Sequence, residues 1–181
     1  MPVEITPTEI PDVLEISSPV FSDERGYFTE SHNTKTWAAQ GFNEKFLQDN
    51  LSLSAKGTLR GMHYQIAPHG MGKLIRAIRG SLFDVAVDLR EDSPTFGKWV
   101  SRVLSAENNV ALWVPVGFAH GFLALEEDTL AYYKCSSVYV PESERSLLYS
   151  DATVGIDWPF EPTLITGKDA EAPLLADAAH F

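Results

Sequence analysis

Short segments that alternate apolar and polar residues recur along the chain, and turn-forming residues separate them. The clearest is KLIRAIRGSLFDVAVDL (73–89), which divides at Gly80-Ser81, a two-residue hairpin signal with glycine at the first turn position. In its second arm every second residue is apolar, with Asp84 and Asp88 in between. This alternation predicts a strand with one buried face.

Further strands are predicted at WVSRVL (99–104), ALWVP (111–115), GFLAL (121–125) and TLAYYKCSSVY (129–139). Their spacing is typical of a sandwich or barrel. Helix signals are few: Asn33 could cap a short helix over Thr34–Gln40 that stops at Gly41, and Lys168–Asp177 could form another. We therefore predict a single all-β domain over residues 1–181 with a few short helices.

Composition excludes several classes of protein. With 44% hydrophobic residues the chain is not disordered. A net charge of −11 argues against binding to nucleic acids or membrane surfaces, because both are anionic. No apolar run approaches the roughly 20 residues of a membrane helix, and the acidic, proline-containing start is unlike a signal peptide. Cys135 is the only cysteine, which favours a buried thiol in a reducing cytoplasm.

The stretch from Asn50 to Phe83 contains no Asp or Glu, although the chain has 25 acidic and 14 basic residues. It holds the basic residues Lys56, Arg60, Lys73, Arg76 and Arg79 and the histidines His63 and His69. Cations gathered in one place in an acidic protein predict a local site for an anion. Within TLRGMHYQ, Arg60 and His63 lie three residues apart, which suggests proton chemistry on a negatively charged ligand.

Each candidate residue also has a purely structural interpretation. His63 is either a base or a satisfied polar residue packed beside Tyr64. His120 lies between two glycines, where it is either a turn residue or close to a ligand that the glycines admit. Tyr133 and Tyr139 are six residues apart, so on one unbroken strand they point to the same face. The two rings then serve either side-chain packing or catalysis.

Histidines on a small β-barrel often hold a metal ion, and such sites often include two histidines at close spacing. The histidines stand at positions 32, 63, 69, 120 and 180 and form no HxH, HxxxH or HxxE cluster. We therefore expect neither a metal nor another cofactor. A metal-dependent enzyme stays an alternative, since two histidines and a remote carboxylate could still converge.

Motifs spread in order over nearly the whole chain resemble the dTDP-4-dehydrorhamnose 3,5-epimerase family, the nucleotide-sugar epimerases of the cupin superfold. They are DERGYFTE (23–30), FLQDN (46–50), TLRGMHYQ (58–65), GKLIRAIRGSLFDVAVDLR (72–90), SPTFGKW (93–99), WVPVGFAHGFLAL (113–125), YKCSSVYVPESE (133–144), GIDWP (155–159) and KDAEAPLL (168–175). The resemblance implies a double-stranded β-helix jelly roll, a homodimer and no metal.

The resemblance also implies a chemistry. The family's substrate is a dTDP-4-keto-6-deoxy sugar, whose ketone acidifies the hydrogens at C3 and C5. The family's base corresponds to His63, and the carboxylate that fixes its tautomer corresponds to Asp169. Lys73 corresponds to the residue beside the C4 oxygen, where an ammonium stabilises an enolate. Tyr133 corresponds to the proton donor on the opposite face of the sugar.

Ligand-binding residues follow from the same resemblance. Tyr139 would stack on the thymine ring, and Arg25, Arg60 and Lys168 would bind the ligand mainly through its pyrophosphate. Further contacts to nucleotide or sugar are assigned to Glu30, Gln48, Asp49, Asn50, His120 and Glu144.

The chain departs from the usual family sequence at Leu51, Leu53, Met71 and Val140. None of these departures removes a catalytic group, but they leave the sugar, the nucleotide base and the number of epimerised centres open. One alternative is a 3-only or 5-only epimerase of a related nucleotide-deoxysugar pathway. An alternative of another class is a non-catalytic module that binds a nucleotide sugar.

Overall fold

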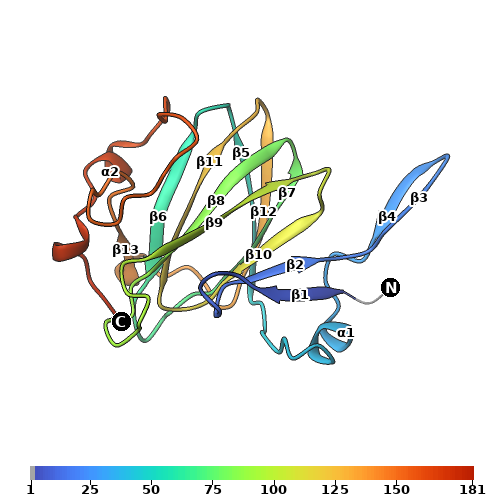
Figure 1. Cartoon of the computed structure of the whole chain (residues 1–181), viewed down its shortest axis with the longest axis horizontal. Coiled ribbons are helices and arrows are strands. Elements are labelled where there is room, and N and C mark those ends of the chain that lie inside the picture. Colours follow the sequence, from blue (N-terminus) through green and yellow to red (C-terminus); the bar gives the residue numbers. More distant parts are fainter. Residues whose placement is uncertain (1–2) are drawn as a thin grey trace.

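The computed structural model describes residues 3–181, which form two sheets that face each other (Figure 1). The first sheet contains, in spatial order, β1 (Glu4–Pro7), β2 (Leu14–Ser17), β10 (Val110–Val114), β7 (Lys73–Arg79), β12 (Thr129–Cys135) and β5 (Gln48–Ser54). The second contains β13 (Glu144–Ser146), β6 (Leu59–Gln65), β11 (Phe118–Ala124), β8 (Ser81–Asp88) and β9 (Trp99–Ser105). A separate hairpin of β3 (Val20–Asp23) and β4 (Gly26–Thr29) projects away from both sheets (Figure 1).

From β5 onward, consecutive strands fall in alternate sheets, with β8 and β9 as the exception. Neighbouring strands of both sheets pair antiparallel. A chain that winds between two sheets in this way forms a double-stranded β-helix jelly roll. The all-β prediction is confirmed, and β9, β10 and β11 lie within three residues of the predicted strands at 99–104, 111–115 and 121–125.

Apolar side chains are buried in three layers. The central layer lies between the sheets and includes Phe118. A second layer lies where the C-terminal part of the chain covers the second sheet, with Leu175 and Val85 in one cluster. In the third, Trp37 belongs to the segment around the short helix and packs with Trp113 of the first sheet. The edge of the first sheet at β5 contributes no residue to these clusters.

The turn predicted at Gly80-Ser81 exists, but the predicted hairpin is wrong. Gly80 has a φ of +68°, a conformation that glycine adopts readily. However, β7 pairs with β10 and β12, whereas β8 pairs with β9 and β11. The chain therefore passes from one sheet to the other at Gly80. Local sequence encodes this turn but not the sheet that the next strand joins.

The prediction that the strand after Gly80 buries one face is also wrong, because β8 is buried on both. Val85 and Val87 belong to the cluster that includes the C-terminal part of the chain, whereas Ala86 belongs to the cluster between the sheets. Asp84 and Asp88 are fully buried as well. The residues that cover the outer face are remote in sequence, so the local alternation cannot reveal them.

Helical structure is limited to short pieces. Helix α1 (Thr34–Ala38) confirms the first helix prediction, and the side chain of Asn33 accepts hydrogen bonds from the backbone at its start. The second prediction, a continuous helix over Lys168–Asp177, is wrong: α2 spans Gly167–Ala170, and a 3₁₀ turn spans Leu175–Asp177. Pro173 lies between them and disfavours helical backbone at the preceding residue. Within residues 3–181, no helix has the length and apolar character to cross a membrane.

The strand predicted over 129–139 ends at Cys135, and a loop and the 3₁₀ turn Pro141–Ser143 follow it. The backbone N–H of Ser136 donates to the Gly72 carbonyl, and the N–H of Gly72 donates to the Ser136 hydroxyl. These bonds draw the chain toward the segment before β7 as the strand ends. Tyr133 therefore lies on β12 and Tyr139 in the loop, so the prediction that they share one strand face is wrong.

Candidate active site

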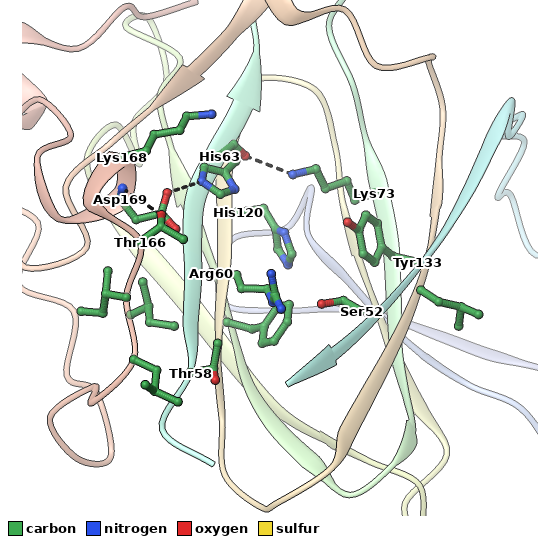
Figure 2. Close-up of a pocket in the computed structure, with 15 residues that line it drawn as sticks. Ser52, Thr58, Arg60, His63, Lys73, His120, Tyr133, Thr166, Lys168 and Asp169 are labelled. Carbon is green, nitrogen blue, oxygen red and sulfur yellow. Dashed lines mark hydrogen bonds and ion pairs between the residues drawn. The ribbon is translucent and has the colours of Figure 1, made fainter. Parts of the chain in front are cut away.

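Two cavities, of about 630 and 300 Å³, share His63, Lys73 and Tyr133 in their linings. Strands β6 and β11 line the larger cavity from one sheet, and β5, β7 and β12 line it from the other (Figure 2). We call the cavity of about 630 Å³ the large cavity and the one of about 300 Å³ the small cavity. Because His63, Lys73 and Tyr133 line both, the two cavities are adjacent, and we refer to them together as the cleft.

A buried carboxylate holds His63 in the cleft. The Nε2 atom of His63 lies 2.6 Å from Oδ1 of Asp169, which is 2% exposed, and the N–H of Gly61 donates to the other carboxylate oxygen at 3.4 Å. Burial raises the pKa of Asp169, but hydrogen bonds from His63 and Gly61 outweigh burial and lower it below its ordinary value. A charged Asp169 keeps a proton on Nε2, which leaves Nδ1 as the basic atom on the cavity side (Figure 2).

Two glycines allow the strands that carry the histidines to approach each other closely. Gly61 has a φ of +138°, and a Cβ at this position would lie 2.5 Å from the Cα of Gly121. On β6 and β11, His63 and His120 stand directly opposite each other. His120 is therefore a strand residue rather than a turn residue and lines the large cavity, while Gly121 beside it admits the neighbouring strand.

Lys73 and Tyr133 reach into the cavity from the strands that face β6 (Figure 2). The ammonium of Lys73 donates to the backbone carbonyl of His63 at 3.2 Å. Burial lowers the pKa of Lys73, and the nearby Cys135 and Asp84 oppose this shift. Burial also raises the pKa of Tyr133, so its phenol is protonated at neutral pH. The cavity thus contains an imidazole on one wall and a proton-bearing phenol on the other.

His120 forms a second histidine–carboxylate pair at the back of the large cavity. Its Nε2 lies 2.8 Å from Oδ1 of Asp84, which is fully buried. Burial lowers the pKa of His120, and the nearby Lys73 and His63 lower it further, against the effect of Asp84. His120 is therefore neutral at pH 7 and presents a second imidazole to the cavity.

Cations line the cleft near these groups. Arg60 donates to the Ser54 hydroxyl and the Leu53 carbonyl, and no carboxylate in residues 3–181 forms an ion pair with it. Lys168 forms an ion pair with Glu144 at 2.5 Å. Partial burial raises the pKa of Glu144, but Lys168 and Tyr139 outweigh burial by hydrogen bonding and lower it. The small cavity is lined by the predicted residues Gln48, Asn50, Tyr139 and Glu144.

Three predicted binding residues lie outside this cleft. Asp49 points to the outer face of the first sheet, where it accepts hydrogen bonds from Lys134 and Tyr132. Arg25 lies at the tip of the β3–β4 hairpin, and Glu30 follows that hairpin. Neither Arg25 nor Glu30 lines the large or the small cavity.

The acid-free stretch does not form one cationic cluster, so this part of the prediction needs correction. Arg60 and Lys73 line the cleft, but Arg76 donates to Asn109 and Arg79 donates to the Asp128 carbonyl elsewhere. Successive strand residues point to opposite faces, so a run of cations along strands divides between them.

Sequence reasoning missed several residues of the cleft. They include Ser52, Thr58, Leu59, Phe122, Leu164, Ile165 and Thr166 in the large cavity and Tyr64, Gln65, Met71 and Cys135 in the small one. Alternation from Asn50 could have placed Ser52 on the inner face of β5. Nothing local marks residues 164–166, which reach the cleft through backbone pairing with the turn before β6. Among the described residues, no three His, Cys, Asp or Glu side chains form a group that could hold a metal ion.

Fold and site together define a class: a cupin-like jelly roll whose cleft is lined by a histidine–carboxylate pair, a tyrosine and several cationic side chains. The family model described as dTDP-4-dehydrorhamnose 3,5-epimerase matches residues 7–177. The chain belongs to this family.

Individual relatives agree with this assignment. The dTDP-4-dehydrorhamnose 3,5-epimerase of Salmonella typhimurium is 51% identical over 174 residues, 94% of each chain. The 3,5-epimerase of Legionella pneumophila, solved with dTDP-4-keto-L-rhamnose, has a TM-score of 0.92 and 45% identity, over 97% of this chain and 94% of that one. ChmJ of Streptomyces bikiniensis, a 3'-monoepimerase solved with dTDP-quinovose, has a TM-score of 0.88 and 36% identity, over 94% of this chain and 87% of that one.

Proposed function

We propose that the protein epimerises dTDP-4-dehydro-6-deoxy-D-glucose at C3 and C5 to dTDP-4-dehydro-L-rhamnose, in dTDP-rhamnose biosynthesis. One observation carries the proposal: the His63–Asp169 pair and Tyr133 line the same cavity from opposite sheets, with Lys73 beside them. Cys135 is buried and unpaired, which suits a reducing compartment, so we place the reaction in the cytoplasm.

In this proposal each group has a defined step. His63 accepts the proton from C3 or C5 through Nδ1, and Asp169 stabilises the imidazolium that forms. The ammonium of Lys73 stabilises the enolate oxygen at C4, where charge develops. Tyr133 donates a proton to the other face of the same carbon, which inverts it. The opposite placement of His63 and Tyr133 supports this order of events.

The nucleotide would extend from this centre into the small cavity. There the exposed ring of Tyr139 offers a stacking surface, and Gln48, Asn50 and Glu144 offer polar contacts. Arg60 and Lys168 would bind the pyrophosphate. Arg60 is available because it lacks a carboxylate partner among the described residues, whereas Lys168 would exchange its contact with Glu144 for a phosphate oxygen.

The active form in this proposal is a homodimer. The β3–β4 hairpin projects from the body and exposes four apolar side chains, Val20, Phe21, Tyr27 and Phe28. Leu51, Leu53 and Ile78 are exposed on the first sheet. Apolar surface of this kind is typical of a protein–protein interface. If the hairpin of one subunit crossed the β5 edge of the other, Arg25 and Glu30 would reach the cleft of the partner subunit.

A 3-only epimerase is the second candidate, because the monoepimerase ChmJ shares this fold at 36% identity. NMR of dTDP-4-dehydro-6-deoxy-D-glucose in deuterated water with this protein separates the possibilities. Deuterium at both C3 and C5 with inversion supports the 3,5-epimerase, and deuterium at one centre supports the monoepimerase. If neither position exchanges, the protein is a binding module and the proposal is wrong.

A further inference from the structure

The side chain of Gln65 is buried between two loops at the small cavity and has no free hydrogen-bonding group. It is the last residue of β6 and is 3% exposed. Its amide nitrogen donates to the carbonyls of His69 at 2.7 Å and Val138 at 3.2 Å. Its amide oxygen accepts from the N–H of Val140 at 2.7 Å. A buried amide satisfied in this way fixes the segments that it joins.

Two of these three contacts flank Tyr139. Because β12 ends at Cys135, residues 137–139 belong to no strand or helix. Gln65 binds the backbone on either side of Tyr139, and the N–H of Tyr139 itself donates to the Gln48 side chain at 2.8 Å. Side chains from β5 and β6 therefore replace the backbone ladder that would otherwise position this loop.

We propose that Gln65 is a positioning residue for nucleotide binding: it fixes the 137–140 loop so that the Tyr139 ring is in place before the base arrives. This inference rests on the proposed function, in which Tyr139 stacks on the base. An aromatic ring on a loop without a backbone ladder must be ordered when ligand binds unless other contacts order it first, and prior ordering increases affinity. Gln65 needs no contact with the ligand to have this effect.

The test is a double-mutant cycle with Gln65→Glu and Tyr139→Ala, in which calorimetry measures the affinity for dTDP. Gln65→Glu keeps the shape and one acceptor but removes both donors and places a charge beside two carbonyls. We expect it to weaken dTDP binding about tenfold, which corresponds to roughly 1.4 kcal/mol, while kcat at saturating substrate stays within about threefold. In the Tyr139→Ala background the same change should have almost no effect on the affinity for dTDP, because the ring that Gln65 positions is absent.

Controls separate the possible outcomes. Gln40→Glu makes the same chemical change at an exposed position after α1 and should leave affinity unchanged. Gln65→Met, an uncharged side chain of similar length, replaces Gln65→Glu if thermal unfolding shows that the charged variant does not fold. Equal weakening in both Tyr139 backgrounds, or an unchanged affinity of the Gln65 variant, overturns the positioning role alone. Unchanged affinity in Tyr139→Ala itself overturns both this inference and the proposed nucleotide subsite.

Discussion

A base that removes a proton from carbon needs a free lone pair and a fixed orientation, and His63 has both. Its Nε2 is engaged by Asp169 and its Nδ1 faces the cavity. We expect His63→Ala to lower kcat by roughly 10²–10⁴-fold, the usual contribution of a general base. The affinity for dTDP should change little, because the imidazole acts on the sugar. Steady-state kinetics and calorimetry measure both, and a kcat within about threefold of the parent would remove His63 from the mechanism.

Tyr133 can be tested without disturbing the packing around it. Tyr133→Phe keeps the ring, which is partly buried against the central cluster, but removes the only transferable proton. We expect deuterium from solvent to enter C3 or C5 with retained configuration, because His63 still removes and returns protons, while little epimer forms. NMR in deuterated water distinguishes the two products. Epimer formation near the parental rate would mean that another group or a water donates the proton.

At the scale of elements, the loop after β8 depends on one buried carboxylate. Asp88 is fully buried and accepts hydrogen bonds from Arg90, Ser93 and Thr95. Burial raises the pKa of Asp88, but these bonds together outweigh burial and lower it to about 2, from an ordinary value of 3.8. Since the folded pKa lies below the unfolded one, the charged form stabilises the fold at pH values above about 4, and this contribution disappears as the pH falls from about 4 to about 2.

The corresponding prediction concerns Asp88→Asn. At pH 7 the variant should have a free energy of unfolding lower by roughly 2 kcal/mol, the value of a shift of this size. The difference from the parent should shrink progressively below about pH 4. Urea unfolding of both proteins at a series of pH values measures it, with Asp92→Asn, exposed in the same loop, as the matched control. A difference in the free energy of unfolding that stays constant down to pH 2.5 would contradict the stabilising role of the charged Asp88 carboxylate.

The elements also show where sequence reasoning succeeds. Asn33 acts within a few residues, so the sequence predicts α1 and its first residue, although the helix ends at Ala38 rather than at Gln40 as predicted. Gly80 likewise predicts a turn, but the choice of sheet depends on contacts with distant strands. Tyr139 leaves the strand face of Tyr133 because Gln65 and Gln48 hold its loop. These contacts span more than 70 residues, so no local pattern encodes them.

Contacts between residues far apart in the sequence also limit what can be predicted of the site. Family resemblance, rather than any local pattern, led to Asp169, which lies 106 residues after His63. The structure brings the pair together because residues 163–164 hydrogen-bond to the backbone at Gly57 and Leu59, and α2 follows directly. Arg25 and Glu30 were assigned by the same resemblance, yet they lie on a projecting hairpin. In a single chain neither residue lines the large or the small cavity.

At the scale of the whole molecule, the homodimer that we propose would give the projecting β3–β4 hairpin a partner surface. A two-fold dimer uses the same surface patch on both subunits, so each hairpin would contact the partner near β5. We expect the protein to be a dimer by sedimentation velocity. Phe28, which is 68% exposed, should belong to the interface, so Phe28→Asp should weaken the dimer and raise the KM for substrate. Val103→Asp, at an exposed apolar residue on the second sheet, is the control.

A mixing experiment decides whether the hairpin serves the partner's cleft. Arg25→Ala removes a cation from the hairpin, and His63→Ala removes the base, so each homodimer should be impaired. In a mixed dimer the subunit with intact His63 receives Arg25 from the other subunit, and one site is complete. Random exchange of subunits should therefore restore about a quarter of all sites, since half of the dimers are mixed and each has one complete site. If activity after exchange equals only the average of the two variants, Arg25 does not act across the dimer.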